Sequence, residues 1–459
     1  MNAGISLQAE AYDGGATVPL MRASVVLTDV LLAVAALAVA RWGACDGGGR
    51  GKGGAPLAAS ACVLLHPTLM LVDHVHFQYN GLLSAVQLGS MLWLVHGART
   101  GGEYGAHAAT VLAALSFAAL LNLKHLYVYA APVYAAELLC GYVGGAGSAR
   151  LSAARCATIA AAVGAVAVLS LGPLLAAGGV AALQAMFGRL FPFGRGLLHA
   201  FWAPNAWAVY AALDKTLALL LHRGGSAQLT GGLVGAGAGA FAVLPGVPPA
   251  AALGLALAAM APAVAAVGLE ARARRQVAAG AAPAPAQLWS TLPRAVVYAN
   301  LCGFVFGFHV HEKALLTALL PLAASGLSDK WGARAFVLLS TSAALACGTL
   351  LHESREAPLR ACFLLVSVLV LPSLALLARG RGAGRLLLRR EALYLGGALC
   401  VEAYALVGHA LLWGERLPFL PLMLISLYAA AGVAYVWLAE MWHFVSALLG
   451  ARAGRAKVA

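Results

Sequence analysis

The sequence predicts an all-α polytopic integral membrane protein with about thirteen to fifteen transmembrane helices and no soluble domain. Hydrophobic residues make up 62% of the 459 residues, charged residues only 10%, and the mean hydropathy is +0.84. A soluble globular chain carries about 25% charged residues, so this composition indicates a surface that faces lipid. Apolar runs near the ~20 residues needed to cross a bilayer recur along the chain, for example at 23–40, 82–95, 157–175 and 335–350.

The apolar runs predict one multi-span domain over residues 23–459, preceded by a polar segment, 1–22. Arginines and an Ala-Pro-Ala-Pro sequence at 268–288 predict a linker between two spans. The first 22 residues are too short and polar to hold a span, and they lack the apolar region of a signal peptide. We therefore expect them to be the remnant of a luminal loop that follows an upstream span.

Charge and cysteine usage exclude several classes of function. The net charge is +13, but the Lys and Arg residues lie mostly in short loops between apolar runs and form no basic face with aromatic residues. The positive-inside rule explains this pattern, so we expect membrane lipids and no nucleic acid as partners. The eight cysteines contain no CxxC pair, which argues against a zinc site or a disulfide framework. No Walker motif or GxSxG motif is present in the sequence.

The same alternation of loops places four polar segments together on the non-cytosolic face. These segments are 73–80, 122–125, 187–205 and 309–313. Polar and ionisable groups at span ends are costly in so apolar a chain, and they commonly mark functional sites. The arrangement predicts a single site that faces a lumen.

The segment 73–80 has six polar side chains in eight residues. An interfacial loop anchored at the lipid headgroups is the alternative, but this density of polar groups favours a function. Acid and imidazole groups suit proton transfer, whereas amide and phenol groups suit binding of sugar hydroxyls. The first set is Asp73, His74 and His76, and the second is Gln78, Tyr79 and Asn80.

The segment 309–313 combines His309, His311, Glu312 and Lys313. Its cation and imidazoles can donate to a phosphate, and its carboxylate can fix the tautomer of one histidine. The two HxH patterns also permit a metal site, since His, Asp and Glu are common zinc and manganese ligands. Four ligands at a recognisable spacing are not found in the sequence, so we assign no metal.

Further cations lie near aromatic residues at Arg189, Arg195 and Lys124. Paired arginines suit a phosphate or pyrophosphate at the membrane surface, and Lys124 either contacts phosphate or snorkels to the interface. Trp202 is expected either in the interfacial aromatic belt or stacked on a sugar. Asn205 completes this segment as a candidate binding residue.

These residues also carry a resemblance to a known family. Residues 73–81 (DHVHFQYNG) and 310–313 (VHEK) resemble the dolichyl-phosphate-glucose-dependent α-1,3-glucosyltransferases of the endoplasmic reticulum. Residues 189–205 (RLFPFGRGLLHAFWAPN) and 304–313 (FVFGFHVHEK) are most similar to the members that add the second glucose to the lipid-linked oligosaccharide. The resemblance extends over most of the chain from about residue 20 onward.

The resemblance implies a GT-C type fold in the endoplasmic reticulum membrane, with the active site facing the lumen. It further implies glucose transfer with inversion, from dolichyl-phosphate-glucose to Glc1Man9GlcNAc2-pyrophosphate-dolichol, without a cofactor or metal. Family members carry their presumed acidic base in a luminal loop upstream, where this chain has only Glu10 and Asp13. The candidate catalytic residues are Asp73, His309 and His311. The candidate substrate-binding residues are His74, His76, Gln78, Tyr79, Asn80, Lys124, Arg189, Arg195, Trp202, Asn205, Glu312 and Lys313.

Three alternatives remain open at this point. One is addition of the first glucose, to Man9GlcNAc2-pyrophosphate-dolichol. Another is a transporter that moves protons or a divalent metal through the histidines and Asp73. The last is a catalytically inactive family member that binds lipid-linked oligosaccharide.

Overall fold

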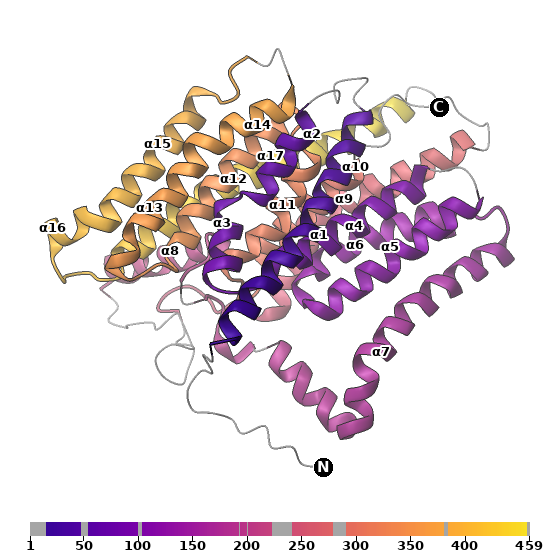
Figure 1. Ribbon diagram of the computed structural model, residues 1–459, viewed down its shortest axis with the longest axis horizontal. Helices are drawn as coiled ribbons and strands as arrows, with labels where there is room; N and C mark the ends of the chain where they lie inside the picture. The colour runs from indigo at the N-terminus through magenta and orange to yellow at the C-terminus, as the bar shows by residue number, and fades with distance from the viewer. Residues whose placement is uncertain are drawn as a thin grey trace.

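The computed structural model describes residues 15–46, 54–99, 103–191, 193–199, 201–222, 241–278, 291–380 and 384–456. Every regular element in these ranges is a helix, and the long helices run alongside one another in a tilted bundle (Figure 1). Ten helices in the same ranges are long and apolar enough to cross a membrane. The predicted all-α polytopic fold is therefore confirmed.

The amino-terminal part of the bundle extends from α1 to α7. A break between α2 and α3 lies at His66, whose extended backbone precedes Pro67, as expected because proline disfavours the α conformation in the residue before it. The helices are α1 (Thr17–Asp46), α2 (Ala55–Leu64), α3 (Pro67–Leu69), the π-helical η1 (Met70–Val75), α4 (Asn80–Arg99), α5 (Glu103–Leu123), the 3₁₀ segment η2 (His125–Ala130), α6 (Ala131–Glu137), the π-helical η3 (Leu138–Val143) and α7 (Ala149–Leu190).

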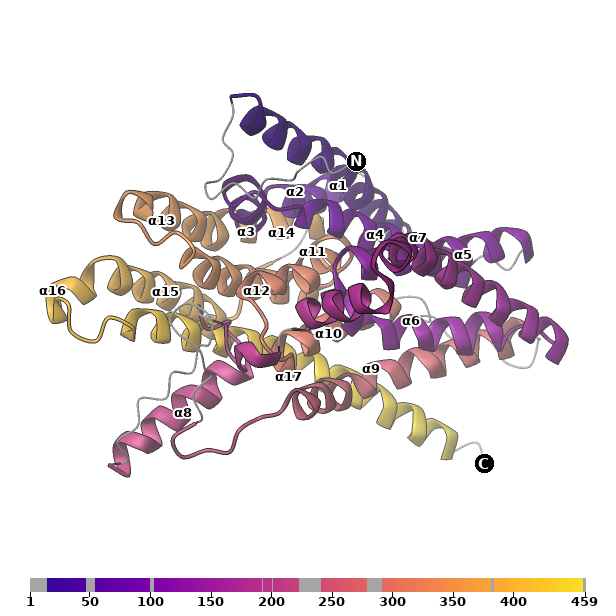
Figure 2. The ribbon, with the colours of Figure 1, turned by 90° about the horizontal axis from the view of Figure 1, so that it is seen from below.

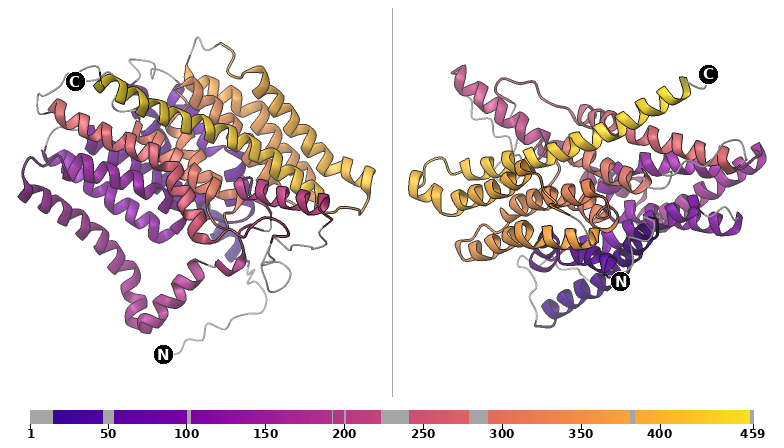
Figure 3. Two further views of the ribbon diagram at one scale, coloured as in Figure 1. Left: turned by 180° about the vertical axis from the view of Figure 1, so that it is seen from behind. Right: turned by 90° about the horizontal axis from the view of Figure 1, so that it is seen from above.

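The carboxy-terminal part extends from α8 to α17, which crosses the back of the bundle beside α9 (Figure 3). Short 3₁₀ or π-helical segments (η4 to η8) precede or continue several of these helices. The elements are η4 (Phe193–Arg195), α8 (Ala206–Leu220), α9 (Pro249–Ala278), α10 (Thr291–Phe306), η5 (Glu312–Leu315), α11 (Leu316–Ser325), α12 (Lys330–Gly348), η6 (Ser354–Glu356), α13 (Ala357–Leu365), η7 (Val366–Val370), α14 (Leu371–Arg379), α15 (Arg389–Ala403), η8 (Tyr404–Gly408), α16 (His409–Trp413) and α17 (Leu420–Ala456).

Some sequence-based boundaries change. The run 335–350, expected as a span, lies in α12, which is not among the ten candidate spans of the described ranges. α12 buries Ser340, Thr341 and Ser342 inside the protein, so it does not need the hydropathy of a lipid-facing helix. The expected linker 268–288 is helical up to Ala278, and residues 279–290 lie outside the described ranges. α1 begins at Thr17, before the expected boundary at 23, and residues 1–14 also lie outside those ranges.

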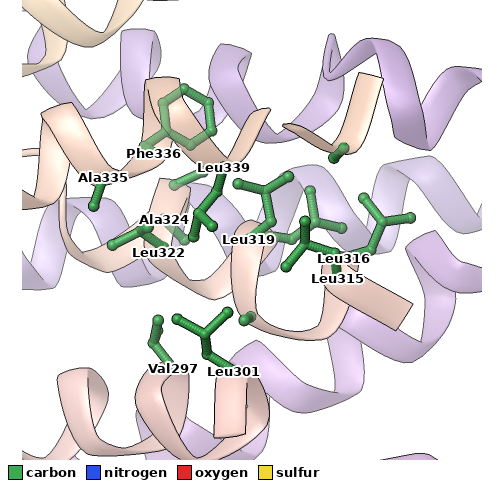
Figure 4. Close-up of a cluster of buried hydrophobic side chains, with 14 of the residues drawn as sticks. Val297, Leu301, Leu315, Leu316, Leu319, Leu322, Ala324, Ala335, Phe336 and Leu339 are labelled. Atoms are coloured by element: carbon green, nitrogen blue, oxygen red, sulfur yellow. The ribbon is translucent and has the colours of Figure 1, made fainter. Parts of the chain in front are cut away.

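The core of the bundle is the short helix α11, which is buried from Leu316 to Ala324. Its leucines lie between Val297 and Leu301 of α10 on one side and Phe336 and Leu339 of α12 on the other (Figure 4). A helix that is apolar on all faces is stable only when it is surrounded by apolar neighbours. This packing fixes η5, which immediately precedes α11 and carries Glu312 and Lys313.

A polar contact anchors α11 among its apolar neighbours. Pro321 has no N–H, so the carbonyl of Thr317 one turn earlier has no partner within the helix. That carbonyl accepts hydrogen bonds from the side-chain amides of Gln87 in α4 (3.1 Å) and Asn300 in α10 (3.0 Å). Buried backbone groups are almost always paired, so these two amides satisfy a group that proline leaves free and join three helices.

α7 packs differently from the other helices. It contacts α5 and η3, and then bends at Gly179, whose φ of 61° is outside the helical region (Figure 1). Seen from below, α7 lies on one side of the bundle, on the side of α5 (Figure 2). Ala162 is its only buried residue in the described ranges, so most of its surface is available to lipid.

A network of buried ion pairs closes the end of the bundle opposite to η5. Arg334 of α12 donates to both carboxylate oxygens of Glu391 in α15, which also accepts from Tyr435 of α17. Nearby, Glu440 of α17 accepts from Arg294 of α10 at 2.7 Å. Each carboxylate has several donors, as buried charges require.

Loss of one partner from the Arg334–Glu391 pair is expected to destabilise the bundle by about 3 kcal/mol, because a buried charge would remain without a counter-ion. Glu391→Leu and Arg334→Met should each lower the thermal unfolding temperature in detergent, and the double variant should recover a large part of the loss. Arg355→Ala is the matched control, since its pair with Glu353 is exposed and should contribute little. A double variant as unstable as the two single losses combined would contradict this assignment.

Candidate functional site

Asp73 lies in the π-helical η1 and holds the loop that leads into α4. Its buried carboxylate accepts hydrogen bonds from the backbone N–H and side-chain amide of Asn80, at 3.1 and 2.8 Å, and from the backbone N–H of Gly81 at 2.6 Å. The first N–H groups of a helix have no partner within it, so Asp73 satisfies the start of α4. Because both oxygens are already occupied, Asp73 is better suited to fixing this loop than to the catalytic role expected from sequence.

Lys124 contacts this loop and lies near enough to Lys313 for the charge of Lys313 to affect it. It lies between α5 and η2, and its Nζ donates to Oδ1 of Asn80 at 2.7 Å. Burial, followed by the positive charge of Lys313, lowers the pKa of Lys124 to about 8. Two lysines close enough to affect each other in this way form a natural site for an anion.

The segment 196–207 is attached to the end of α10 by hydrogen bonds. His309 donates from Nδ1 to the carbonyl of Gly196 at 2.9 Å and from its backbone N–H to Leu197 at 3.0 Å. Farther along, the indole N–H of Trp207 donates to the carbonyl of Gly307 at 2.9 Å. These bonds bring the segment 196–207 onto the segment that follows α10.

Asn205 and Trp202 have structural positions within this attachment. The side-chain amide of Asn205 donates to the carbonyl of Phe304, and its Oδ1 accepts from the first turn of α8, at Trp207 and Ala208. Asn205 is therefore a helix cap whose polar atoms are already used. Trp202 is buried as well, and the ammonium of Lys215 lies 5.1 Å from the centre of its ring. We therefore assign neither residue to substrate, in contrast to the sequence-based expectation.

Three histidines gather where the two segments meet. The ring centres of His199 and His311 are 3.5 Å apart, and those of His199 and His309 are 5.6 Å apart. Burial lowers the pKa of His311 to about 4, and burial also lowers the pKa of His309, with smaller contributions from nearby positive charges including Arg195. His311 is therefore neutral near pH 7.

Glu312 lies next to these histidines and is 1% exposed. Its Oε2 is 3.6 Å from Nδ1 of His199, and neither carboxylate oxygen has a hydrogen-bond partner among the described residues. Burial acts to raise the pKa of Glu312, but His199, with smaller contributions from the backbone N–H of Glu312 and from His311, keeps the pKa below its usual value. A carboxylate buried in this way needs an adjacent positive or hydrogen-bonding group, and His199 is the nearest one.

The remaining candidates lie at the edge of this arrangement. His76 is exposed, and Gln78 accepts a hydrogen bond from the side chain of Asn80 at 3.2 Å. Arg195 is exposed but close enough to His309 to affect its pKa. Arg189 is exposed in the last turn of α7, and no contact joins it to the histidines in the described part of the chain. The structure thus brings together three of the four predicted polar segments, 73–80, 122–125 and 309–313. Of the fourth segment, 187–205, only the part after η4 lies close to the others.

Two residues near the site were not among the sequence-based candidates. His199 lies within the predicted segment 187–205, but its position among aromatic residues gave no sign that it would reach Glu312. Asp29 lies inside the apolar run 23–40, and its Oδ2 is 3.1 Å from Nε2 of His74. A carboxylate in the middle of an apolar run is the signal that could have identified Asp29.

Among the described residues, one group has the geometry to hold a metal ion. His199, His311 and Glu312 each offer a ligand atom, and these atoms lie within 4.8 Å of one another. Three such ligands would leave a coordination position open, as in catalytic zinc sites. The same contacts are explained by a buried carboxylate that holds a histidine, and we assign no metal to them.

Asp73→Ala is expected to destabilise the protein by about 3 kcal/mol, because it leaves three N–H donors at the start of α4 unpaired. Asp73→Asn keeps one oxygen acceptor and should have a smaller effect. Thermal unfolding in detergent measures both, with His76→Ala as an exposed control from the same loop. If Asp73→Ala unfolds at the wild-type temperature, this side chain does not hold the loop.

Comparison with known proteins identifies the family of this chain. A family model described as the ALG6, ALG8 glycosyltransferase family matches residues 2–440. The chain is 35% identical to an Arabidopsis thaliana protein (83% of this chain, 72% of the relative), 34% to one from Mus musculus (93% and 78%) and 33% to one from Bos taurus (97% and 81%). All three relatives are named dolichyl pyrophosphate Glc1Man9GlcNAc2 alpha-1,3-glucosyltransferase. This chain therefore belongs to the ALG6, ALG8 glycosyltransferase family.

Proposed function

We propose that this protein transfers glucose from dolichyl-phosphate-glucose to Glc1Man9GlcNAc2-pyrophosphate-dolichol, with formation of an α-1,3 linkage. The name shared by the relatives supports the acceptor and the linkage. The observation that carries the proposal is a group of three histidines at one end of a membrane bundle, beside Lys313, whose charge lowers the pKa of Lys124. We further propose that this end faces the lumen of the endoplasmic reticulum, because most basic loops lie at the opposite end.

The two lysines would hold the phosphate of a lipid-linked substrate. Lys124 is fixed by its hydrogen bond to Asn80, and Lys313 is fixed by its place at the start of the buried core helix. Cations held in advance at a partly buried site stabilise developing negative charge without having to reorganise. Arg195, which is near His309, would add a third positive charge from the opposite segment.

The reaction that this arrangement supports is a single displacement at C1 of glucose. The acceptor hydroxyl oxygen forms a bond to C1 while the bond from C1 to the donor phosphate oxygen breaks. The electron pair of that bond leaves with dolichyl phosphate, whose charge the lysines stabilise. The hydroxyl proton passes to a base, and attack from the opposite face converts a β-linked donor into an α-linked product.

The histidines would contact the reacting groups in their neutral form. A carbonyl can only accept a hydrogen bond, so His309 must donate Nδ1–H to Gly196, which leaves a lone pair on Nε2. His311 is also neutral near pH 7, with a pKa of about 4. We keep both as candidates for proton transfer, and we assign His199 and Glu312 to holding the position of His311.

Glucose transfer to two acceptor lipids tests the proposal directly. The purified protein is supplied with dolichyl-phosphate-glucose and either the Glc1Man9GlcNAc2 or the Man9GlcNAc2 lipid, with and without EDTA. We expect transfer to the first acceptor in both conditions. Lys313→Ala should lower kcat/KM by on the order of a hundredfold. Lys330→Ala, an exposed lysine at the opposite end of the bundle, is the control. Preference for the Man9GlcNAc2 lipid, or transfer to neither, would contradict the proposal.

The lowered pKa of Lys124 predicts a pH dependence. Its ammonium form is lost as the pH rises through about 8, so kcat/KM should fall over that range. Lys124→Arg keeps its charge and should move this fall to higher pH. An unchanged pH profile in Lys124→Arg would show that another group controls the alkaline limb.

A further inference from the structure

We propose that Asp29 and His74 form a sugar-binding subsite, in which His74 contacts a hexose of a lipid-linked saccharide and Asp29 holds His74 in position. The ligand class rests on the proposed function, whereas the subsite itself rests on the geometry of α1 and η1. Asp29 is the positioning residue of the pair. His74 is the residue that would touch the ligand.

Asp29 occupies an unusual place in α1. It interrupts an apolar run of a candidate membrane span, where an ionisable side chain is costly and is commonly functional. Its Oδ2 lies 3.1 Å from Nε2 of His74, and the two side chains are 27% and 36% exposed. The pair is therefore partly exposed, unlike the Arg334–Glu391 pair at the opposite end of the bundle, whose side chains are 14% and 2% exposed.

The contact with Asp29 determines which ring atom of His74 is left for a ligand. A carboxylate beside Nε2 favours a proton on that nitrogen, as in carboxylate–histidine pairs that orient an imidazole. Nδ1 then carries the lone pair, and it has no hydrogen-bond partner among the described residues. A ligand hydroxyl group that donates to Nδ1 would give each ring nitrogen of His74 a hydrogen-bond partner.

The surroundings of the pair favour a hydroxyl over a phosphate. A Cβ on Gly81 would lie 3.4 Å from Oδ1 of Asp29 and 3.3 Å from Oδ2 of Asp73, so two carboxylates lie near the start of α4. Next to them, the hydroxyl groups of Ser24 and Tyr79 are 2.9 Å apart. Two carboxylates repel an anion, whereas carboxylate, imidazole and hydroxyl groups together match the donors and acceptors of a sugar.

This placement separates two ends of one ligand. Asn80 lies between them, because its backbone and amide donate to Asp73 while its Oδ1 accepts from Lys124. Lys124 and Lys313 lie on the side that attracts phosphate. The contacts continue from Asn80 through Asp73 to Gly81, beside which Asp29 and His74 would receive the sugar attached to that phosphate.

Binding measured separately for sugar and phosphate tests this inference. The full chain in nanodiscs is titrated with a short-chain polyprenyl-phosphate-glucose, with polyprenyl phosphate of the same length, and with free Glc1Man9GlcNAc2 glycan. We expect Asp29→Ala and His74→Ala each to weaken binding of the glucosylated lipid by about tenfold, as loss of one or two hydrogen bonds would. Binding of the bare polyprenyl phosphate should be unchanged.

The pair is expected to act as one unit, so the double variant should bind no worse than either single variant. Asp29→Glu, which keeps the carboxylate, should restore part of the affinity. His352→Ala, an exposed histidine after α12, is the control. If Asp29→Ala lowers the unfolding temperature, Asp29→Asn is measured in its place. Asp29→Asn retains an oxygen beside His74 and should show a smaller loss of sugar binding.

The outcomes distinguish the sources of the hexose. Weaker binding of the glucosylated lipid alone places the donor glucose beside His74, and weaker binding of the free glycan alone places a hexose of the acceptor there. Equal loss for the bare polyprenyl phosphate, or no change for any probe, would overturn the inference. A wild-type protein that binds the glucosylated lipid but transfers no glucose would remove the proposed function and leave the subsite standing.

Discussion

The carbonyl of Thr317 is the polar contact on which the site depends. Pro321 deprives it of a helical partner, and amides from α4 and α10 take that place inside an apolar core. The same three helices support the site, because α4 begins at Asn80, α10 leads to His309, and α11 follows Lys313. One buried acceptor therefore ties together the elements that carry the loop of Asp73, His309 and Lys313.

Around this fixed core, the binding groups come from loops with their own hydrogen bonds. Asp73 fixes its loop through the first turn of α4, and the segment 196–207 is fixed through carbonyl groups at the end of α10. Polar groups used in this way have less capacity left for a substrate. Among the groups that keep free capacity, the two lysines and Nε2 of His309 lie on the proposed phosphate side, and Nδ1 of His74 lies on the proposed sugar side.

Much of this arrangement could be predicted from sequence. Hydropathy predicts the helical class, and alternation of basic loops predicts that the polar segments share one end. Side-chain roles could not be predicted in the same way. Asp73 is a cap only because the chain turns back over it at Asn80, and Arg189 lies in a helix that buries only Ala162 among its described residues. Asp29 stands out as a carboxylate in an apolar run, but its pairing could not be predicted, since its partner His74 comes from another helix.

The proposed mechanism requires one phosphate to lie between Lys124 and Lys313. Electron cryomicroscopy of the protein with a non-transferable analogue of dolichyl-phosphate-glucose would locate that phosphate. We expect phosphate density within hydrogen-bond distance of both ammonium groups, with the sugar directed toward His74. Phosphate density at Arg189, or among the arginines at the opposite end of the bundle, would contradict it.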